Sequence, residues 1–142
     1  MTDPVIPDSR HLFDLPYATL STAQRLDLYW PIEGDGPFPV IVSIHGGAFM
    51  AGDKRDDQVT PMLEGLTRGY AVASLNYRLS GEARFPALIH DAKAAIRWLR
   101  ANSATYRLDP IRFAAWGGSA GGYLALMVGL TANRPDLDDL SL

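Results

Sequence analysis

Three short runs of mostly apolar residues predict strands that are buried on both faces. They are "PVIVSI" (39–44), "YAVASLNY" (70–77) and "IRFAAW" (111–116). Runs of this kind are typical of parallel sheets, because helices cover both faces of such a sheet. A fourth run, "RLDLYW" (25–30), has an apolar residue at every second position, which predicts a half-buried strand.

Helical spacing appears between and after these runs. Segment 85–106 is the clearest helix, with Pro86 suited to its first turn. A shorter helix is predicted at 61–67, ending at Gly69, and segment 121–133 predicts a core helix that is apolar nearly all round. The apolar face of the clearest helix comprises Leu88, Ala92, Ala95, Ile96 and Leu99. Because strands and helices alternate, the sequence predicts βαβ crossovers, a mostly parallel sheet and the α/β fold class.

The length of 142 residues suits a single domain that has a core of its own. We expect residues 1–24, which are rich in proline and aspartate and show no clear period, to form a surface arm. Residues 25–133 are expected to form the core, which extends to the end of the helix predicted at 121–133. Residues 134–142 form a tail without a clear pattern.

Composition excludes several classes of function. The net charge is −3 and the charged residues are scattered, so neither nucleic acid nor an anionic membrane surface is an expected partner. The chain has no cysteine, which excludes thiolate nucleophiles and thiolate metal sites, and no metal site is predicted. The N-terminus has no basic region followed by an apolar run, so no signal peptide is expected and a cytoplasmic location is the default.

The stretch "AAWGGSAGGYLALM" (114–127) contains a G-x-S-x-G pattern centred on Ser119. In this pattern a serine projects from a sharp turn between a strand and a helix, and the small residues Gly117 and Gly121 allow the two elements to pack closely. The N–H of Ala120, at the start of the helix, would face an oxyanion formed on the substrate. The alternative is a glycine-rich turn in which the serine caps the helix.

The stretch "HGGAF" (45–49) directly follows a predicted strand. Glycines in such a loop allow backbone N–H groups to approach a substrate, so Gly46 and Gly47 are candidate oxyanion donors. Ala48 stands where a third glycine would complete the HGGG-type pattern of lipases and esterases. An ordinary glycine turn is the alternative, but both patterns in this order favour a serine hydrolase.

With these motifs the sequence resembles the α/β-hydrolase carboxylesterases, in particular the hormone-sensitive-lipase-like group and the bacterial feruloyl- or acetyl-xylan-esterase-like group. The likeness covers most of residues 25–133, and the chain corresponds to the N-terminal half of that fold. The resemblance implies ester hydrolysis by a Ser-His-acid triad without a cofactor. It makes Ser119 the nucleophile and His45 a scaffold residue, and it makes oxyanion donors of Gly46, Gly47 and Ala120.

The triad order of this fold is serine, then acid, then histidine. All three histidines of the chain (His11, His45 and His90) precede Ser119, so neither the triad histidine nor the acid is identified in this sequence. His90 has a neighbour in Asp91, but adjacent helix residues point about 100° apart, so His90 is expected to be structural. Three aspartates follow Ser119 too early to match the acid: Asp136, Asp138 and Asp139.

Without further strands, 111–116 would form an exposed apolar edge of the sheet. We therefore expect self-association or pairing with a complementary C-terminal half. The expected substrate is a small ester, with a short acyl chain suggested by the family. Two alternatives stay open: a peptidase or arylformamidase of the same fold, and an incomplete hydrolase-like chain that serves only in binding or assembly.

Overall fold

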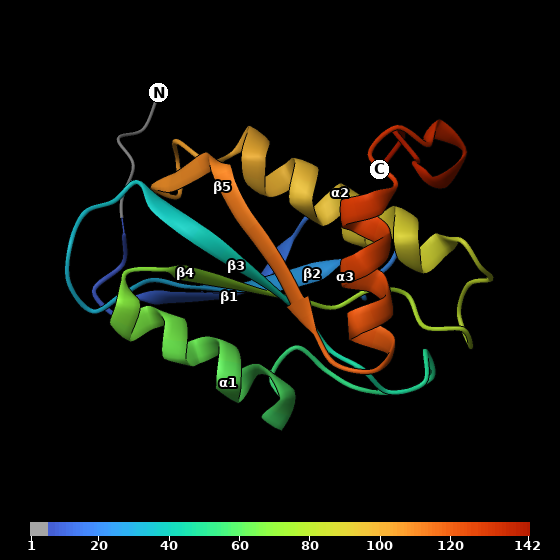
Figure 1. Cartoon of the computed structure of the whole chain (residues 1–142), viewed down its shortest axis with the longest axis horizontal. Helices are drawn as coiled ribbons and strands as arrows, with labels where there is room; N and C mark the ends of the chain where they lie inside the picture. The colour runs from blue at the N-terminus through green and yellow to red at the C-terminus, as the bar shows by residue number, and fades with distance from the viewer. Residues whose placement is uncertain (1–5) are drawn as a thin grey trace.

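The strands of residues 6–142 form one five-stranded sheet in the order β1-β2-β4-β3-β5. The computed structural model describes residues 6–142, and Figure 1 shows the sheet with helices on both sides. The strands are β1 (His11–Pro16), β2 (Arg25–Tyr29), β3 (Phe38–Ile44), β4 (Ala71–Leu75) and β5 (Leu108–Gly117). The longer helices are α2 (Ala87–Ala101) and α3 (Ala120–Leu130). A shorter helical stretch is made of η1 (Asp57–Val59), α1 (Thr60–Leu63) and η2 (Glu64–Arg68), and a final turn is η3 (Pro135–Leu137).

The α/β fold class is confirmed, and the sheet is mixed. β3 pairs in parallel with both β4 and β5, whereas β2 pairs antiparallel with β1 and β4. The predicted short helix ends as expected at Gly69, which adopts a left-handed conformation with φ of 82°. Among residues 6–142, no helix is long and apolar enough to cross a bilayer.

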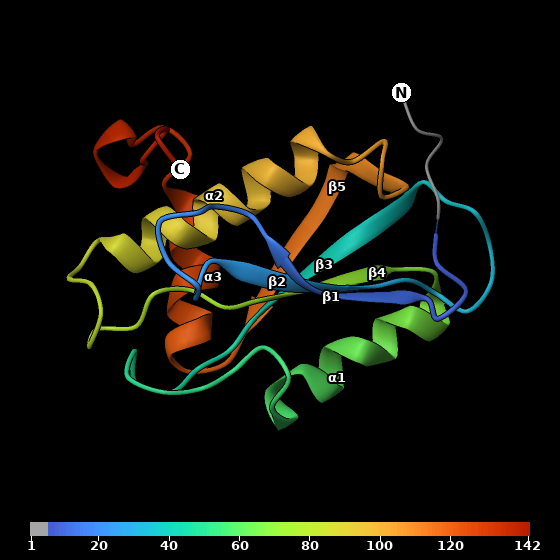
Figure 2. The same cartoon turned by 180° about the vertical axis from the view of Figure 1, so that it is seen from behind.

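Side-chain alternation along the central strands explains the layers. Val40, Val42 and Ile44 of β3 belong to the main core, which α2 and α3 cover. Ile41, on the other face of β3, packs in a smaller cluster with Met62 of α1. The views in Figures 1 and 2 accordingly place α1 on the opposite side of the sheet from α2.

The prediction of a surface arm is wrong for residues 11–16, which form strand β1 at one edge of the sheet. The pairing of β1 with β2 shifts register between Leu12 and Leu15, and Asp14 in that interval has a φ of 59°. Such a bulge breaks the two-residue alternation on which strand prediction depends. Leu12 and Leu15 nevertheless both pack against the main core.

The opposite edge of the sheet is β5, as predicted for a chain without further strands, and the prediction that 111–116 is buried on both faces is wrong because no strand or helix covers this edge within residues 6–142. Ile111 is 86% exposed and Trp116 is 48% exposed. Helix α3 was expected to lie in a core, but Leu126 and Leu130 are exposed and only its other side packs on the sheet. Self-association or pairing with a complementary half through this edge stays a prediction.

Candidate active site

Ser119 occupies the turn between β5 and α3 in a strained backbone conformation. Its φ is 53° and its ψ is −123°, a region that residues other than glycine rarely adopt. Its side chain is exposed and makes no capping hydrogen bond with the helix. The structure therefore does not support a helix-capping serine and leaves the hydroxyl group available for chemistry.

The glycines around Ser119 are required because the elements approach closely. A Cβ added to Gly121 would collide with the backbone carbonyl of Ile44 at the end of β3. A Cβ added to Gly117 would lie 2.5 Å from the same carbonyl oxygen. The small residues two before and two after Ser119 thus allow the turn to pack against β3.

The loop after β3 is anchored to the far strands of the sheet by an ionic cluster. Lys54 Nζ lies 2.7 Å from a carboxylate oxygen of Asp14 and 3.0 Å from one of Asp27. Arg55 contacts the same two carboxylates at 2.7 Å each. The hydrogen bonds from Lys54 and Arg55 hold the pKa of Asp14 below its ordinary value. This cluster joins β1 and β2 to the loop that follows "HGGAF".

His45 is buried at the start of this loop. Its ring stacks on that of Tyr77, with centroids 4.6 Å apart, and the Tyr77 hydroxyl donates to the His45 carbonyl at 2.7 Å. His45 Nδ1 lies 2.9 Å from the Gly46 carbonyl. Since a carbonyl only accepts, this contact requires the proton on Nδ1. These contacts suit a scaffold role better than a base.

The backbone N–H groups near Ser119 differ in availability. The Gly46 N–H donates to Gln58 Oε1 at 2.6 Å, so this predicted donor is already engaged. Within residues 6–142, no hydrogen bond occupies the N–H of Gly47, Ala48 or Ala120. Gly46 instead packs against the turn, because a Cβ added there would lie 3.2 Å from Ser119 Cβ.

His11 is not in a position to serve Ser119. His11 pairs with Tyr29, which pairs with Val72 near the start of β4, whereas Ser119 follows the end of β5. His11 therefore lies at the opposite edge and the opposite end of the sheet.

His90 Nε2, in α2, is buried without a hydrogen-bond partner among residues 6–142. Its neighbour Asp91 instead bonds to Arg78 and Gln24. No His–Asp pair forms, as the helical spacing predicted. The late aspartates also have other partners: Asp138 pairs with Arg97 and Asp136 with Arg134.

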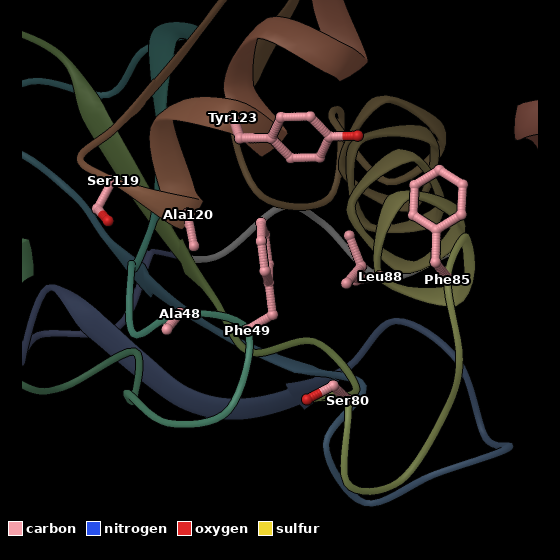
Figure 3. Close-up of a pocket in the computed structure, with 8 residues that line it drawn as sticks. All are labelled: Ala48, Phe49, Ser80, Phe85, Leu88, Ser119, Ala120 and Tyr123. Carbon is pink, nitrogen blue, oxygen red and sulfur yellow. The ribbon is translucent and has the colours of Figure 1, made fainter.

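A mainly apolar pocket of about 490 Å³ opens beside Ser119. Figure 3 shows its lining residues, which come from the loop after β3, the segment between β4 and α2, the start of α2, and the turn that leads into α3 with the first residues of that helix. They are Ala48, Phe49, Ser80, Phe85, Leu88, Ser119, Ala120 and Tyr123. The rings of Phe49 and Tyr123 meet edge to face with centroids 5.6 Å apart. The pocket can hold a small apolar group next to the serine hydroxyl.

Sequence reasoning missed Gln58 and most of the pocket. Gln58 lies 12 residues after Gly46, in the three-residue turn η1, which is too short to show periodicity, so no pattern signals their contact. Phe85 precedes α2 and Tyr123 lies within α3, and only the fold brings them together. The unused N–H of Ala48 could have been anticipated, since Ala48 occupies the third position of the glycine motif.

Ionisation of Tyr77 provides a test of this packing. Burial raises the pKa of Tyr77 to about 12 from the ordinary value of 10.0. Between these values the unfolded chain releases this proton while the folded chain retains it. The stability that the buried, protonated Tyr77 contributes to the folded chain is therefore complete below pH 10 and is lost as the pH rises through 12.

We expect Tyr77→Phe to weaken this loss of stability with pH. At about pH 8 the variant should be less stable by about 1 kcal/mol, because the hydrogen bond to His45 is lost. The difference from the unaltered chain should shrink and then change sign as the pH rises from 10 to 12, because a rise in pKa from 10.0 to about 12 corresponds to more than about 1 kcal/mol, and urea unfolding can measure this. A constant difference across this range would contradict the buried, protonated phenol.

Comparison with known proteins places this geometry in a family. Residues 26–141 match the BD-FAE family. The probable carboxylic ester hydrolase LipM of Mycobacterium tuberculosis is 37% identical over 131 residues, which cover 90% of this chain and 30% of LipM. Esterase LipQ of the same organism is 36% identical over 127 residues, covering 87% of this chain and 30% of LipQ. The chain thus spans about 30% of the length of these curated relatives.

Solved structures of esterases share the fold. A bifunctional GH43-CE protein of Bacteroides eggerthii superposes with a TM-score of 0.83 at 37% identity, covering 90% of this chain and 18% of that one. Esterase B of Lactobacillus rhamnosis, inhibited by a tributyrin phosphonate, has a TM-score of 0.77 at 27% identity, covering 95% and 45% of the two chains. The resemblance to α/β-hydrolase carboxylesterases is confirmed, and the chain belongs to the BD-FAE family.

Proposed function

We propose that this chain contributes the nucleophile and the oxyanion donors of a serine carboxylesterase. The observation that supports this most strongly is the strained turn at Ser119, whose free hydroxyl lies at an apolar pocket lined also by Ala48 and Ala120. A catalytic serine needs this exposure, and a serine used only for capping would not need the strain.

The proposed reaction is acyl transfer. Ser119 Oγ forms a bond to the ester carbonyl carbon and gives its proton to a base, and the alkoxide leaves as the alcohol. The carbonyl oxygen becomes an oxyanion that the N–H groups of Gly47 and Ala120 stabilise, with Ala48 as a further candidate donor. Water then releases the acid from the acyl-serine.

The base and its acid partner are proposed to lie outside these 142 residues. No histidine follows Ser119 in the sequence, His11 lies at the opposite edge of the sheet, and the His45 ring is held by Tyr77 and the Gly46 carbonyl. When triad members are removed, the oxyanion hole and substrate binding alone still accelerate the reaction about 10³–10⁴-fold over the reaction in water. We therefore expect the 142-residue chain to react slowly.

The proposed substrates are esters with a small apolar acyl or alcohol group. Phe49, Leu88 and Tyr123 offer apolar contact in a pocket of about 490 Å³. Related structures include a Thermogutta terrifontis esterase with propionate bound, at 30% identity. That likeness, with the pocket, supports short acyl chains.

Covalent trapping tests the nucleophile. We expect p-nitrophenyl butyrate, with imidazole added as a soluble base, to acylate the chain at Ser119, and Ser119→Ala to abolish this labelling. Tandem mass spectrometry locates the acyl group. Ser80 lines the same pocket, so Ser80→Ala is the matched control and should retain the label. Equal labelling of the chain and the Ser119→Ala variant would refute the proposed role.

A further inference from the structure

The peptide groups that link His45, Gly46 and Gly47 have an unusual set of hydrogen bonds. We propose that Gln58 is a positioning residue that holds these peptides so that the Gly47 N–H faces the reacting carbonyl of the ester. The proposal rests on the serine esterase function proposed above, and it assigns a role to a side chain outside the two motifs.

The first peptide group is held on both sides. The His45 carbonyl accepts from the Tyr77 hydroxyl at 2.7 Å, and the Gly46 N–H donates to Gln58 Oε1 at 2.6 Å. In a planar trans peptide the C=O and the N–H point in opposite directions. Rotation of this peptide would therefore break both hydrogen bonds.

The second peptide group is held on one side only. The Gly46 carbonyl accepts from Gln58 Nε2 at 3.2 Å and from His45 Nδ1 at 2.9 Å. Planarity directs the Gly47 N–H away from these two partners. Of the four polar groups in the two peptides, the Gly47 N–H alone makes no hydrogen bond within residues 6–142.

Glutamine suits this position because its amide has both a donor and an acceptor. It binds the N–H and the C=O of the same residue, Gly46. Asp56 determines which way the amide faces, since its carboxylate accepts from Gln58 Nε2 at 3.1 Å and from the Gln58 backbone N–H at 3.0 Å. We call the two hydrogen bonds between Gln58 and Gly46 the clamp. The clamp matters because Gly47 has a φ of 137° and no side chain that would restrict its backbone.

Two replacements test these hydrogen bonds. Gln58→Leu removes both, whereas Gln58→Glu replaces the donor to the Gly46 carbonyl and to Asp56 with a carboxylate oxygen, which both of these groups repel. Gln58 is exposed, so neither replacement disturbs the core. Asp57→Asn, at the adjacent exposed position, is the matched control.

The test combines hydrogen exchange with acylation of the 142-residue chain. In Gln58→Leu we expect the Gly46 amide to exchange about tenfold faster by NMR, the effect of losing roughly 1.4 kcal/mol. The rate at which saturating p-nitrophenyl butyrate acylates Ser119 should fall about 10- to 100-fold. The ester concentration that gives half of the maximal rate should change little. Gln58→Glu should also acylate slowly, because its carboxylate cannot donate to the Gly46 carbonyl and is repelled by Asp56. A loss confined to the rate at saturating ester is not what a merely structural role predicts.

Unchanged Gly46 exchange in Gln58→Leu would overturn the clamp. Faster exchange with acylation within about twofold of the control would overturn its role in the reaction. If acylation does not depend on Ser119, the proposed function fails instead. The exchange comparison still decides whether Gln58 holds the loop.

Discussion

Asp91→Ala is expected to lower the free energy of unfolding by about 3–5 kcal/mol, because it leaves a charge without its partner in a buried position. The Asp91 side chain is fully buried, and Arg78 is only 12% exposed. One carboxylate oxygen accepts from the Arg78 N–H and Nε at 2.9 Å. The other accepts from Arg78 Nη2 at 2.8 Å and from Gln24 Nε2 at 2.9 Å.

The loss should extend beyond one ion pair. Gln24 Oε1 accepts the N–H groups of Leu20 and Ser21, so Asp91 connects α2 to the segment before β2 as well as to the residues after β4. Urea unfolding followed by circular dichroism measures the change. Asp136→Ala removes an equivalent but exposed pair with Arg134 and should have little effect. Equal effects of the two variants would contradict the importance of the buried network.

Gly121→Ala is the second variant with a large expected effect. It should lower the free energy of unfolding by about 2–3 kcal/mol. The added methyl group would meet the Ile44 carbonyl and the backbone of His45, which cannot move aside as a flexible side chain could. Better helix propensity offsets only about 1 kcal/mol of this cost. Because the collision separates α3 from β3, acylation of Ser119 should also fall.

Gly129→Ala provides a control of opposite sign in the same helix. An added Cβ at Gly129 meets nothing within 4 Å, so the variant should gain up to about 1 kcal/mol from helix propensity. Thermal unfolding of the two variants should shift in opposite directions. A destabilised Gly129→Ala, or a Gly121→Ala of unchanged stability, would contradict the close packing of the turn on β3.

Much of the fold could be predicted because the burial of the central strands is visible in the residues of each strand itself. Strands β3 and β4 are covered on both faces, which requires nearly continuous apolar runs. The alternation of Leu26, Leu28 and Trp30 likewise matched their complete burial. The turn at Ser119 was predictable because its glycines are needed at fixed spacing.

The remaining features depend on contacts between distant residues. Asp27 occupies the polar side of its alternation, yet it is fully buried because Lys54 and Arg55 reach it from another loop. Strand β1 was missed because its bulge interrupts the alternation. The contact of Gln58 with Gly46 follows from the path of the loop, which no local pattern encodes.

The structure of the chain after reaction with a p-nitrophenyl phosphonate tests the role of Ser119 most directly. We predict a phosphorus atom bonded to Ser119 Oγ, with a phosphonyl oxygen about 3 Å from the N–H groups of Gly47 and Ala120. Phosphorus on Ser80 or on another side chain would contradict the assignment of the nucleophile. An adduct on Ser119 whose oxygen points away from both N–H groups would contradict the assignment of the oxyanion donors.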